Sequence, residues 1–186
     1  MTTPARVVLY GEDSEDDAFL MRRAFSEARF PGSLVVVGDG WDVTRYLSGD
    51  GRYADRGANP LPHLVLLDLK MPHFTGLEAL AWIRARAELD ATPVIMLSSP
   101  GLEIDIASAY ANGADAYVVK PGGLHALGAL VKDLVPVCAE AHGTPAFASV
   151  QSAVPPPEAI RQKRKRVGRH DDQAVFDAHR NRFGIV

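Results

Sequence analysis

Residues 63–72 read HLVLLDLKMP, in which an apolar run leads without a polar break into a single aspartate, Asp68, and a proline ends the run. A continuous apolar run of this length is typical of a strand buried on both faces, as in a parallel sheet. Asp68 would then lie at the carboxyl end of that strand, where open α/β sheets bind their ligands. Taken alone, an aspartate there is equally well explained as the start of a turn or a helix cap, so the other strand ends decide its role.

Apolar runs and segments of helical periodicity alternate along the first 135 residues. Strands are expected at about 6–10, 34–37, 63–67, 93–97 and 116–119, and helices at about 15–28, 41–47, 75–84, 102–112 and 124–135. This alternation predicts a parallel sheet with helices on both faces, because each crossover must be right-handed. Without a mononucleotide glycine fingerprint, the expected α/β fold is the flavodoxin-like doubly wound (βα)5 sheet with strand order 2-1-3-4-5. Residues 48–61, rich in Gly, Asp, Arg and Pro, are expected to form a long exposed loop.

Two of the predicted helices begin with good capping residues. Ser14 is expected to cap the first helix, with Asp17 in the position where a capping box places an acid, and Thr75 is expected to cap the third. Capping does not account for Glu12 and Asp13, which precede Ser14 at the end of the first strand. Such an acidic turn is more often simply solvated, although paired carboxylates also suit a hard divalent cation.

The chain divides into a main domain, residues 1–136, and an extension, residues 137–186. The extension holds eight Lys or Arg and five Asp or Glu, whereas the whole chain has a net charge of −3. The main domain is therefore acidic, which argues against nucleic-acid binding by that part. Residues 146–157 resemble a Pro-containing linker, and residues 161–170 carry six basic side chains without an acid. A disordered, solvated tail is the favoured interpretation. Its alternative is an electrostatic contact with nucleic acid, an acidic partner or the main domain.

Composition predicts a cytoplasmic protein. Hydrophobic residues make up 47% of the chain and charged residues 23%, as in ordinary globular domains. The single cysteine, Cys138, fits a reducing compartment. No apolar window reaches the ~18 residues of a membrane helix, and residues 1–6 lack the pattern of a signal peptide. We therefore expect no membrane partner.

The predicted strand ends bring chemically related side chains to one edge of the sheet. Glu12 and Asp13 follow the first strand, Asp68 the third, Ser98 the fourth and Lys120 the fifth. Together they would form a shallow site of three carboxylates, a hydroxyl and an ammonium. Carboxylates of this kind hold Mg²⁺ weakly until a phosphoryl group completes its shell. The lysine and the serine can take the remaining phosphoryl oxygens.

In this combination the chain resembles the receiver domain of bacterial two-component response regulators. The resemblance covers residues 5–135 and includes the spacings, with Ser98 30 residues and Lys120 52 residues after Asp68. Gly76, eight residues after Asp68, and Tyr117, three before Lys120, also fit. The long loop before the third strand and the turn at residues 37–40 resemble stand-alone receivers that partner bacterial phytochromes.

The resemblance implies a role for each strand-end residue. Asp68 would be the phosphoacceptor, and Mg²⁺ would be held by Asp13 directly and by Glu12 through water. Asp68 itself and the backbone carbonyl of Lys70 would complete the protein's share of the metal ligands. Lys120 would contact the phosphoryl group, and Ser98 would be the switch hydroxyl. Tyr117 would be the aromatic switch, whose ring swings inward.

The resemblance also implies the partners: a sensor histidine kinase, of the phytochrome photoreceptor type, and a second copy in a homodimer. Such a protein is a phosphorylation switch that acts on no substrate other than its own phosphoryl group. One alternative is a receiver that regulates transcription through its basic tail. Another is a Mg²⁺-dependent phosphohydrolase on the same fold, which is disfavoured because Leu69 and Lys70 provide no second acid after Asp68 and no cap insertion follows.

Overall fold

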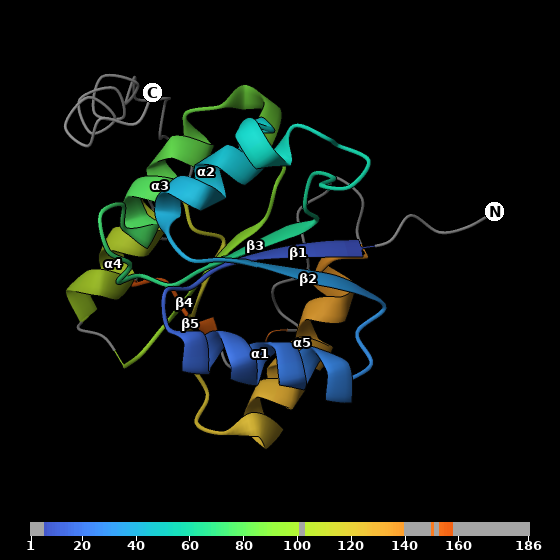
Figure 1. Ribbon diagram of the computed structural model, residues 1–186. Helices are drawn as coiled ribbons and strands as arrows, with labels where there is room; N and C mark the ends of the chain where they lie inside the picture. Colours follow the sequence, from blue (N-terminus) through green and yellow to red (C-terminus); the bar gives the residue numbers. More distant parts are fainter. Residues whose placement is uncertain (1–5, 101–102, 140–149, 151–152, 158–186) are drawn as a thin grey trace.

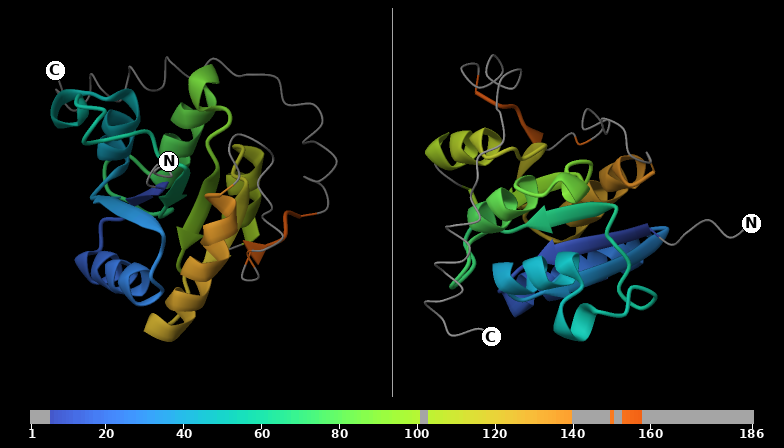
Figure 2. Two further views of the ribbon diagram at one scale, coloured as in Figure 1. Left: turned by 90° about the vertical axis from the view of Figure 1, so that its right-hand side faces the viewer. Right: turned by 90° about the horizontal axis from the view of Figure 1, so that it is seen from above.

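The computed structural model describes residues 6–100, 103–139, 150 and 153–157, which form a sheet covered by helices on both faces (Figure 1, Figure 2). The strands are β1 (Arg6–Gly11), β2 (Gly32–Val37), β3 (Leu64–Leu67), β4 (Val94–Ser98), β5 (Ala116–Val119) and β6 (Ala153–Val154). The α-helices are α1 (Glu15–Glu27), α2 (Gly40–Ser48), α3 (Gly76–Arg84), α4 (Glu103–Ala111) and α5 (Leu124–Val137). The first five strands are parallel in the order β2-β1-β3-β4-β5, so the predicted doubly wound order is confirmed.

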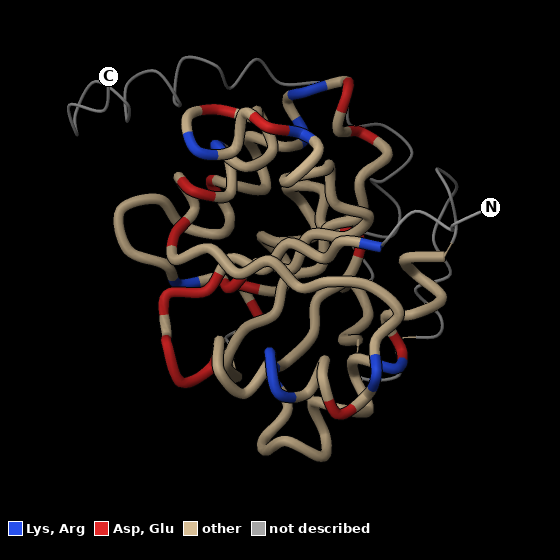
Figure 3. Tube along the Cα trace, turned by 45° about the vertical axis from the view of Figure 1, so that its right-hand side comes forward, with Lys and Arg blue, Asp and Glu red and all other residues tan. Residues whose placement is uncertain are grey.

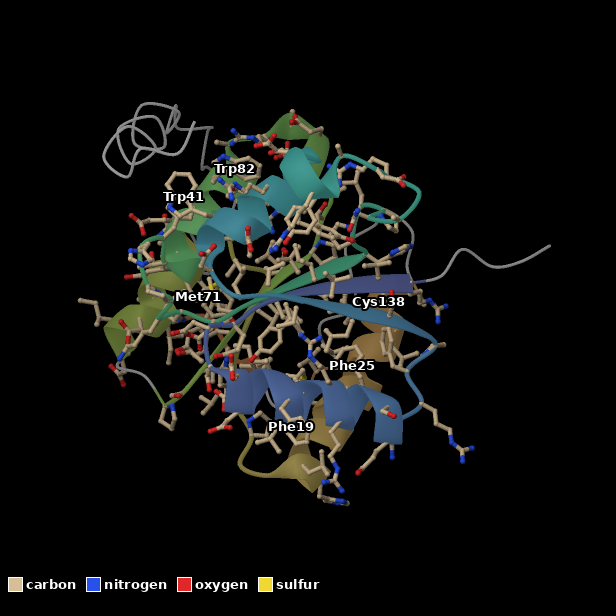
Figure 4. All side chains as sticks on the ribbon, in the orientation of Figure 1. Phe19, Phe25, Trp41, Met71, Trp82 and Cys138 are labelled. Atoms are coloured by element: carbon tan, nitrogen blue, oxygen red, sulfur yellow. The ribbon has the colours of Figure 1, made fainter. Side chains whose placement is uncertain are left out.

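The apolar character of β3 follows from its position between two helical layers. Leu66 packs in a core with α1 and α5, whereas its neighbour Leu67 packs in a second core with α2 and α3. Figure 4 shows Phe25 of α1 on one side of the sheet and Trp41 of α2 on the other. Since both faces are buried, the strand has no polar alternation, and its first polar side chain comes only where the strand ends. In the described part of the chain, none of the helices combines the length and apolarity needed to span a membrane.

Side-chain caps begin the helices where the sequence predicted them. The hydroxyl of Ser14 accepts a hydrogen bond from the backbone N–H of Asp17 at the start of α1. Thr75 and Glu78 form a complete capping box at the start of α3, each side chain accepting from the other residue's backbone N–H. The side chain of Asp17 does not return to Ser14 and is used elsewhere.

The connection between α2 and β3 is more ordered than the sequence predicted. It contains a short 3-10 helix, Gly51–Tyr53, and the Tyr53 ring is buried edge-on against Tyr46. The Arg56 guanidinium donates to the carbonyls of Tyr46 and Leu47 in the last turn of α2, and the Tyr46 carbonyl also accepts from the backbone N–H of Gly49. A buried aromatic and a carbonyl-binding arginine therefore hold this loop against the core, and its irregular sequence pattern gave no sign of them.

A sixth strand, which the sequence did not predict, comes from the expected linker. β6 pairs antiparallel with β5, with Tyr117 opposite Val154 and Val118 opposite Ala153. Val150, just before it, is 3% exposed and packs in the core with α5. The hydroxyl of Tyr110 in α4 accepts from the backbone N–H of Tyr117 and donates to the carbonyl of Val154. One tyrosine thus bridges the two strands. The predicted basic segment 161–170, and a short helix that the sequence also allows at residues 171–182, lie outside the described residues.

We predict that Tyr110→Phe loosens β6, because it leaves the Tyr117 N–H and the Val154 carbonyl without their shared partner. Unpaired buried groups cost about 1–3 kcal/mol each, so amide exchange at residues 153–154 should accelerate by roughly tenfold or more. Tyr46→Phe is the matched control, since it removes a hydroxyl that donates to the Pro60 carbonyl far from β6. Unchanged amide exchange at residues 153–154 in Tyr110→Phe would contradict this prediction and would mean that β5 and β6 pair directly without the hydroxyl.

The start of α3 packs against the backbone of Asp68 so tightly that only glycine fits at Gly76. A Cβ there would lie 2.0 Å from the Asp68 carbonyl oxygen. We therefore expect Gly76→Ala to lower the free energy of unfolding by roughly 1–3 kcal/mol, as overpacking does. Gly128→Ala in α5 is the control: its Cβ meets open space, and it should raise stability by about 0.5–1 kcal/mol. Urea unfolding of both variants measures the difference, and equal stability of the two would contradict the close packing.

Candidate functional site

The strand-end residues predicted from the sequence lie at one edge of the sheet. Glu12 follows β1, Asp68 follows β3, Ser98 ends β4 and Lys120 follows β5. Figure 3 shows the acidic stretch in which β1 passes into α1 at this edge. The backbone N–H of Asp68 donates to the carbonyl of Gly11, and that of Lys120 to the carbonyl of Ser98. Sheet pairing therefore extends past the last strand residues and fixes the positions of both side chains.

The ammonium group of Lys120 lies at the centre of the site. Its Nζ is 2.6 Å from Glu12 Oε2, 2.8 Å from Asp68 Oδ1 and 2.8 Å from Asp17 Oδ2. Burial by itself lowers the pKa of this lysine, but hydrogen bonds to the three carboxylates outweigh burial and raise the pKa above its ordinary value. Lys120 is therefore firmly cationic at neutral pH and neutralises part of the acidic charge around it.

Glu12 is buried, and each of its oxygens has a protein partner. Oε1 accepts from the backbone N–H of Ser14, and Oε2 accepts from both Lys120 and the hydroxyl of Tyr10. Burial raises the pKa of Glu12, and the hydrogen bonds from these donors partly offset that rise. Burial, and then the hydrogen bond to Glu12, raises the pKa of Tyr10, so this phenol remains a neutral donor. Glu12 is thus held in one orientation.

Asp68 is nearly as enclosed as Glu12. Its Oδ2 accepts a 2.6 Å hydrogen bond from the backbone N–H of Lys70, while Oδ1 faces the Lys120 ammonium. The Lys70 side chain is exposed and turns away from the core. The backbone donor and the cation together fix the orientation of the Asp68 carboxylate.

Ser98 and Tyr117 lie behind the charged group. Ser98 is 3% exposed, and Tyr117 is fully buried with no hydrogen bond to its hydroxyl within the described residues. Burial raises the pKa of Tyr117, and the neighbouring Ser98 side chain opposes that rise. In this structure the ring of Tyr117 is already inside, and its predicted role as an aromatic switch stays a prediction.

The predicted cation site carries acids that suit a hard ion, but a lysine occupies its centre. Carboxylate oxygens are the donors that Mg²⁺ and Ca²⁺ prefer. Asp13 is exposed beside them, and no three Asp, Glu, His or Cys side chains of the described chain are grouped as a ready metal site. Glu12 Oε2 and Asp68 Oδ1 are both bound to Lys120. The residues fit a divalent cation once Lys120 yields some of these bonds, and the ligand roles, including that of the Lys70 carbonyl, stay predictions.

Two residues of this site were missed at the level of sequence. Asp17 was assigned to helix capping, yet its carboxylate binds Lys120, and Tyr10 was counted only as part of a strand. A signal existed for each. Tyr10 is two residues before Glu12, so both side chains project from the same face of the strand, and a side chain in the first helical turn is tilted back toward the helix start.

Comparisons with known proteins agree with this geometry. Residues 8–132 match the response regulator receiver domain family. Response regulator Rcp1 of Synechocystis sp. is 29% identical over 133 residues, which cover 72% of this chain and 88% of Rcp1. The crystal structure of the phosphorylated cyanobacterial phytochrome response regulator RcpA is 32% identical, covers 70% of this chain and 91% of RcpA, and has a TM-score of 0.63.

The Mn²⁺-bound form of response regulator Rcp1 is also similar, with 26% identity, coverage of 82% of this chain and 99% of that one, and a TM-score of 0.62. The family match spans more than half of the chain and includes Glu12, Asp68, Ser98 and Lys120. It confirms the resemblance derived from these residues. The chain belongs to the response regulator receiver domain family and is similar to the phytochrome response regulators within it.

Proposed function

We propose that this receiver is the phosphoacceptor of a two-component phosphorelay and takes a phosphoryl group on Asp68 from a histidine kinase. The observation that carries the proposal is the enclosed Asp68 carboxylate, with one oxygen 2.8 Å from the Lys120 ammonium and the other on a backbone N–H. This arrangement orients a nucleophile and places a cation where negative charge must be neutralised.

In the proposed transfer, an oxygen of Asp68 attacks phosphorus and forms the new O–P bond. The P–N bond to the kinase histidine breaks, and the imidazole nitrogen keeps the electron pair and takes up a proton. Phosphoryl transfer has a loose transition state, so positioning and charge neutralisation supply most of the catalysis. Lys120 would move from the Asp68 oxygen to a phosphoryl oxygen, which carries the charge after transfer.

Mg²⁺ is the cation that we propose for the acids Glu12, Asp13 and Asp68. When bound, it would neutralise charge on the phosphoryl oxygens. The donor set of carboxylates supports a hard divalent ion, as does the likeness to the Mn²⁺-bound Rcp1 structure. The protein's own part is to hold Glu12 rigidly through Tyr10 and Ser14 and to keep Asp13 exposed at the entrance.

Ser98 and Tyr117 are proposed to carry the signal away from Asp68. The Ser98 hydroxyl would donate to a phosphoryl oxygen, and the loop after β4 would shift with it. Tyr117 adjoins Ser98 and lies under α4, so this shift would reach the surface formed by α4, β5 and α5. We propose that this surface binds a second copy of the chain or an output partner. The likeness to RcpA supports a phytochrome-type kinase as the cytoplasmic donor.

The test is phosphorylation by acetyl phosphate with and without Mg²⁺, read by intact mass. Wild type should gain one phosphoryl group per chain only with Mg²⁺, and Asp68→Asn should gain none. Asp16→Asn, an exposed acid of α1, is the control and should keep the adduct. Gel filtration of the same samples reports whether the adduct changes assembly.

Two results would contradict the proposal. An adduct that persists in Asp68→Asn would place the phosphoryl group elsewhere. A folded wild type that gains no adduct at any Mg²⁺ concentration would mean that this receiver does not accept phosphate.

A further inference from the structure

The contact between Lys120 and Asp17 is not explained by the roles assigned so far. Asp17 Oδ2 lies 2.8 Å from Lys120 Nζ, as close as the Asp68 oxygen. The Asp17 side chain is 40% exposed, whereas those of Glu12 and Asp68 are 1% and 7% exposed. Lys120 therefore has two enclosed carboxylate partners at the strand ends and one open partner on α1.

The three N–H donors of the Lys120 ammonium are all used. An ammonium group has three N–H donors, and Lys120 directs one to each of the three carboxylates. The oxygens of Glu12 and Asp68 also accept from Tyr10, Ser14 and the Lys70 backbone. A phosphoryl oxygen that accepts a hydrogen bond from Lys120 must therefore displace one of the three carboxylates, and a cation on Asp68 or Glu12 must share an oxygen-bearing group with Lys120.

We propose that Asp17 is a positioning residue, an outer anchor that holds the Lys120 ammonium while its bonds to Asp68 and Glu12 are exchanged. This inference rests on the proposed phosphoacceptor function. Asp17 suits the task because α1, and not a strand end, carries it. Its partial exposure also spares its carboxylate much of the cost of burial. With the anchor in place, Lys120 can leave Asp68 without becoming an unpaired, half-buried charge, which is costly.

The competing explanation is that Asp17 only stabilises α1. Two observations argue against it. The cap at Ser14 uses the backbone N–H of Asp17 and not its side chain. Glu15 and Asp16 already place negative charge in the same first turn, where it favours the helix dipole. A purely structural role therefore predicts a stability change that does not depend on Lys120.

The experiment is a double-mutant cycle that combines Asp17→Asn with Lys120→Met. Asp16→Asn, which also removes one negative charge from α1, is the control and is made both in wild type and in Lys120→Met. The first readout is Mn²⁺ affinity, measured by the electron paramagnetic resonance signal of free Mn²⁺ without any phosphoryl donor. The second is the rate of adduct formation with acetyl phosphate at saturating Mg²⁺. Urea unfolding checks that all variants are folded.

Without its outer anchor, Lys120 should hold Asp68 and Glu12 more firmly and compete with the cation. Asp17→Asn should therefore weaken Mn²⁺ binding and slow adduct formation by roughly five- to tenfold, the loss expected for one charge-assisted hydrogen bond, and well beyond the effect of Asp16→Asn. In the Lys120→Met background, Asp17→Asn and Asp16→Asn should have equal effects on Mn²⁺ affinity.

The positioning role is overturned if Asp17→Asn matches Asp16→Asn in the lysine-containing protein, or if its excess effect persists in Lys120→Met. A wild type that binds Mn²⁺ but forms no adduct contradicts the phosphoacceptor function alone. The Mn²⁺ affinities of the variants then still decide the role of Asp17. A folded wild type that neither binds Mn²⁺ nor forms an adduct overturns both.

Discussion

The attraction between one ammonium group and three carboxylates organises the functional edge of this protein. Lys120 reaches Glu12, Asp17 and Asp68 from the end of β5, and two of these acids are almost fully enclosed. Buried carboxylates without a counter-charge would each cost several kcal/mol. The lysine therefore allows acids to be placed side by side where three separate segments of the chain meet. It also makes the site responsive, because a phosphoryl oxygen that bonds to Lys120 must displace one of these carboxylates.

The sheet supplies the geometry that this attraction needs. β1, β3, β4 and β5 are parallel and buried on both faces, so their carboxyl ends meet at one edge and their polar residues can appear only there. Gly76 lets α3 approach the backbone of Asp68, and Tyr10 turns Glu12 toward Lys120. Glu12 and Asp68 are thus held by the buried strand ends, whereas the exposed Asp13 and the partly exposed Asp17 lie on the solvent side.

Much of this arrangement was predictable because it follows from patterns that act over short distances. Apolar runs and helical periods placed the five parallel strands and the α-helices to within two residues, and the strand-end rule assembled Glu12, Asp68, Ser98 and Lys120. Long-range partners were not predictable. The two residues of β6 carry no strand signal, and they are held by a hydroxyl 44 residues away in α4. Asp17 is a good capping residue as well as a lysine partner, and a local rule recognises only the first role.

The β6 strand also takes part in enclosing Tyr117, with which it pairs through Val154. Its backbone N–H is bound to Tyr110, whose hydroxyl also holds Val154, so α4, β5 and β6 share one hydrogen-bonded junction. The ring of Tyr117 lies beneath this junction and next to Ser98. A change at the Asp68 site that displaced Ser98 would therefore act on the strand that closes the sheet as well as on α4.

The most direct test of the central claim is the free energy of unfolding of wild type and Lys120→Met in urea, with and without Mg²⁺. Without Mg²⁺, Lys120→Met should be less stable by roughly 3 kcal/mol, because the enclosed acids lose their counter-charge. Saturating Mg²⁺ should stabilise Lys120→Met more than wild type, since the cation then neutralises the same carboxylates without competition. A variant as stable as wild type without Mg²⁺, or a deficit that Mg²⁺ leaves unchanged, would contradict the account.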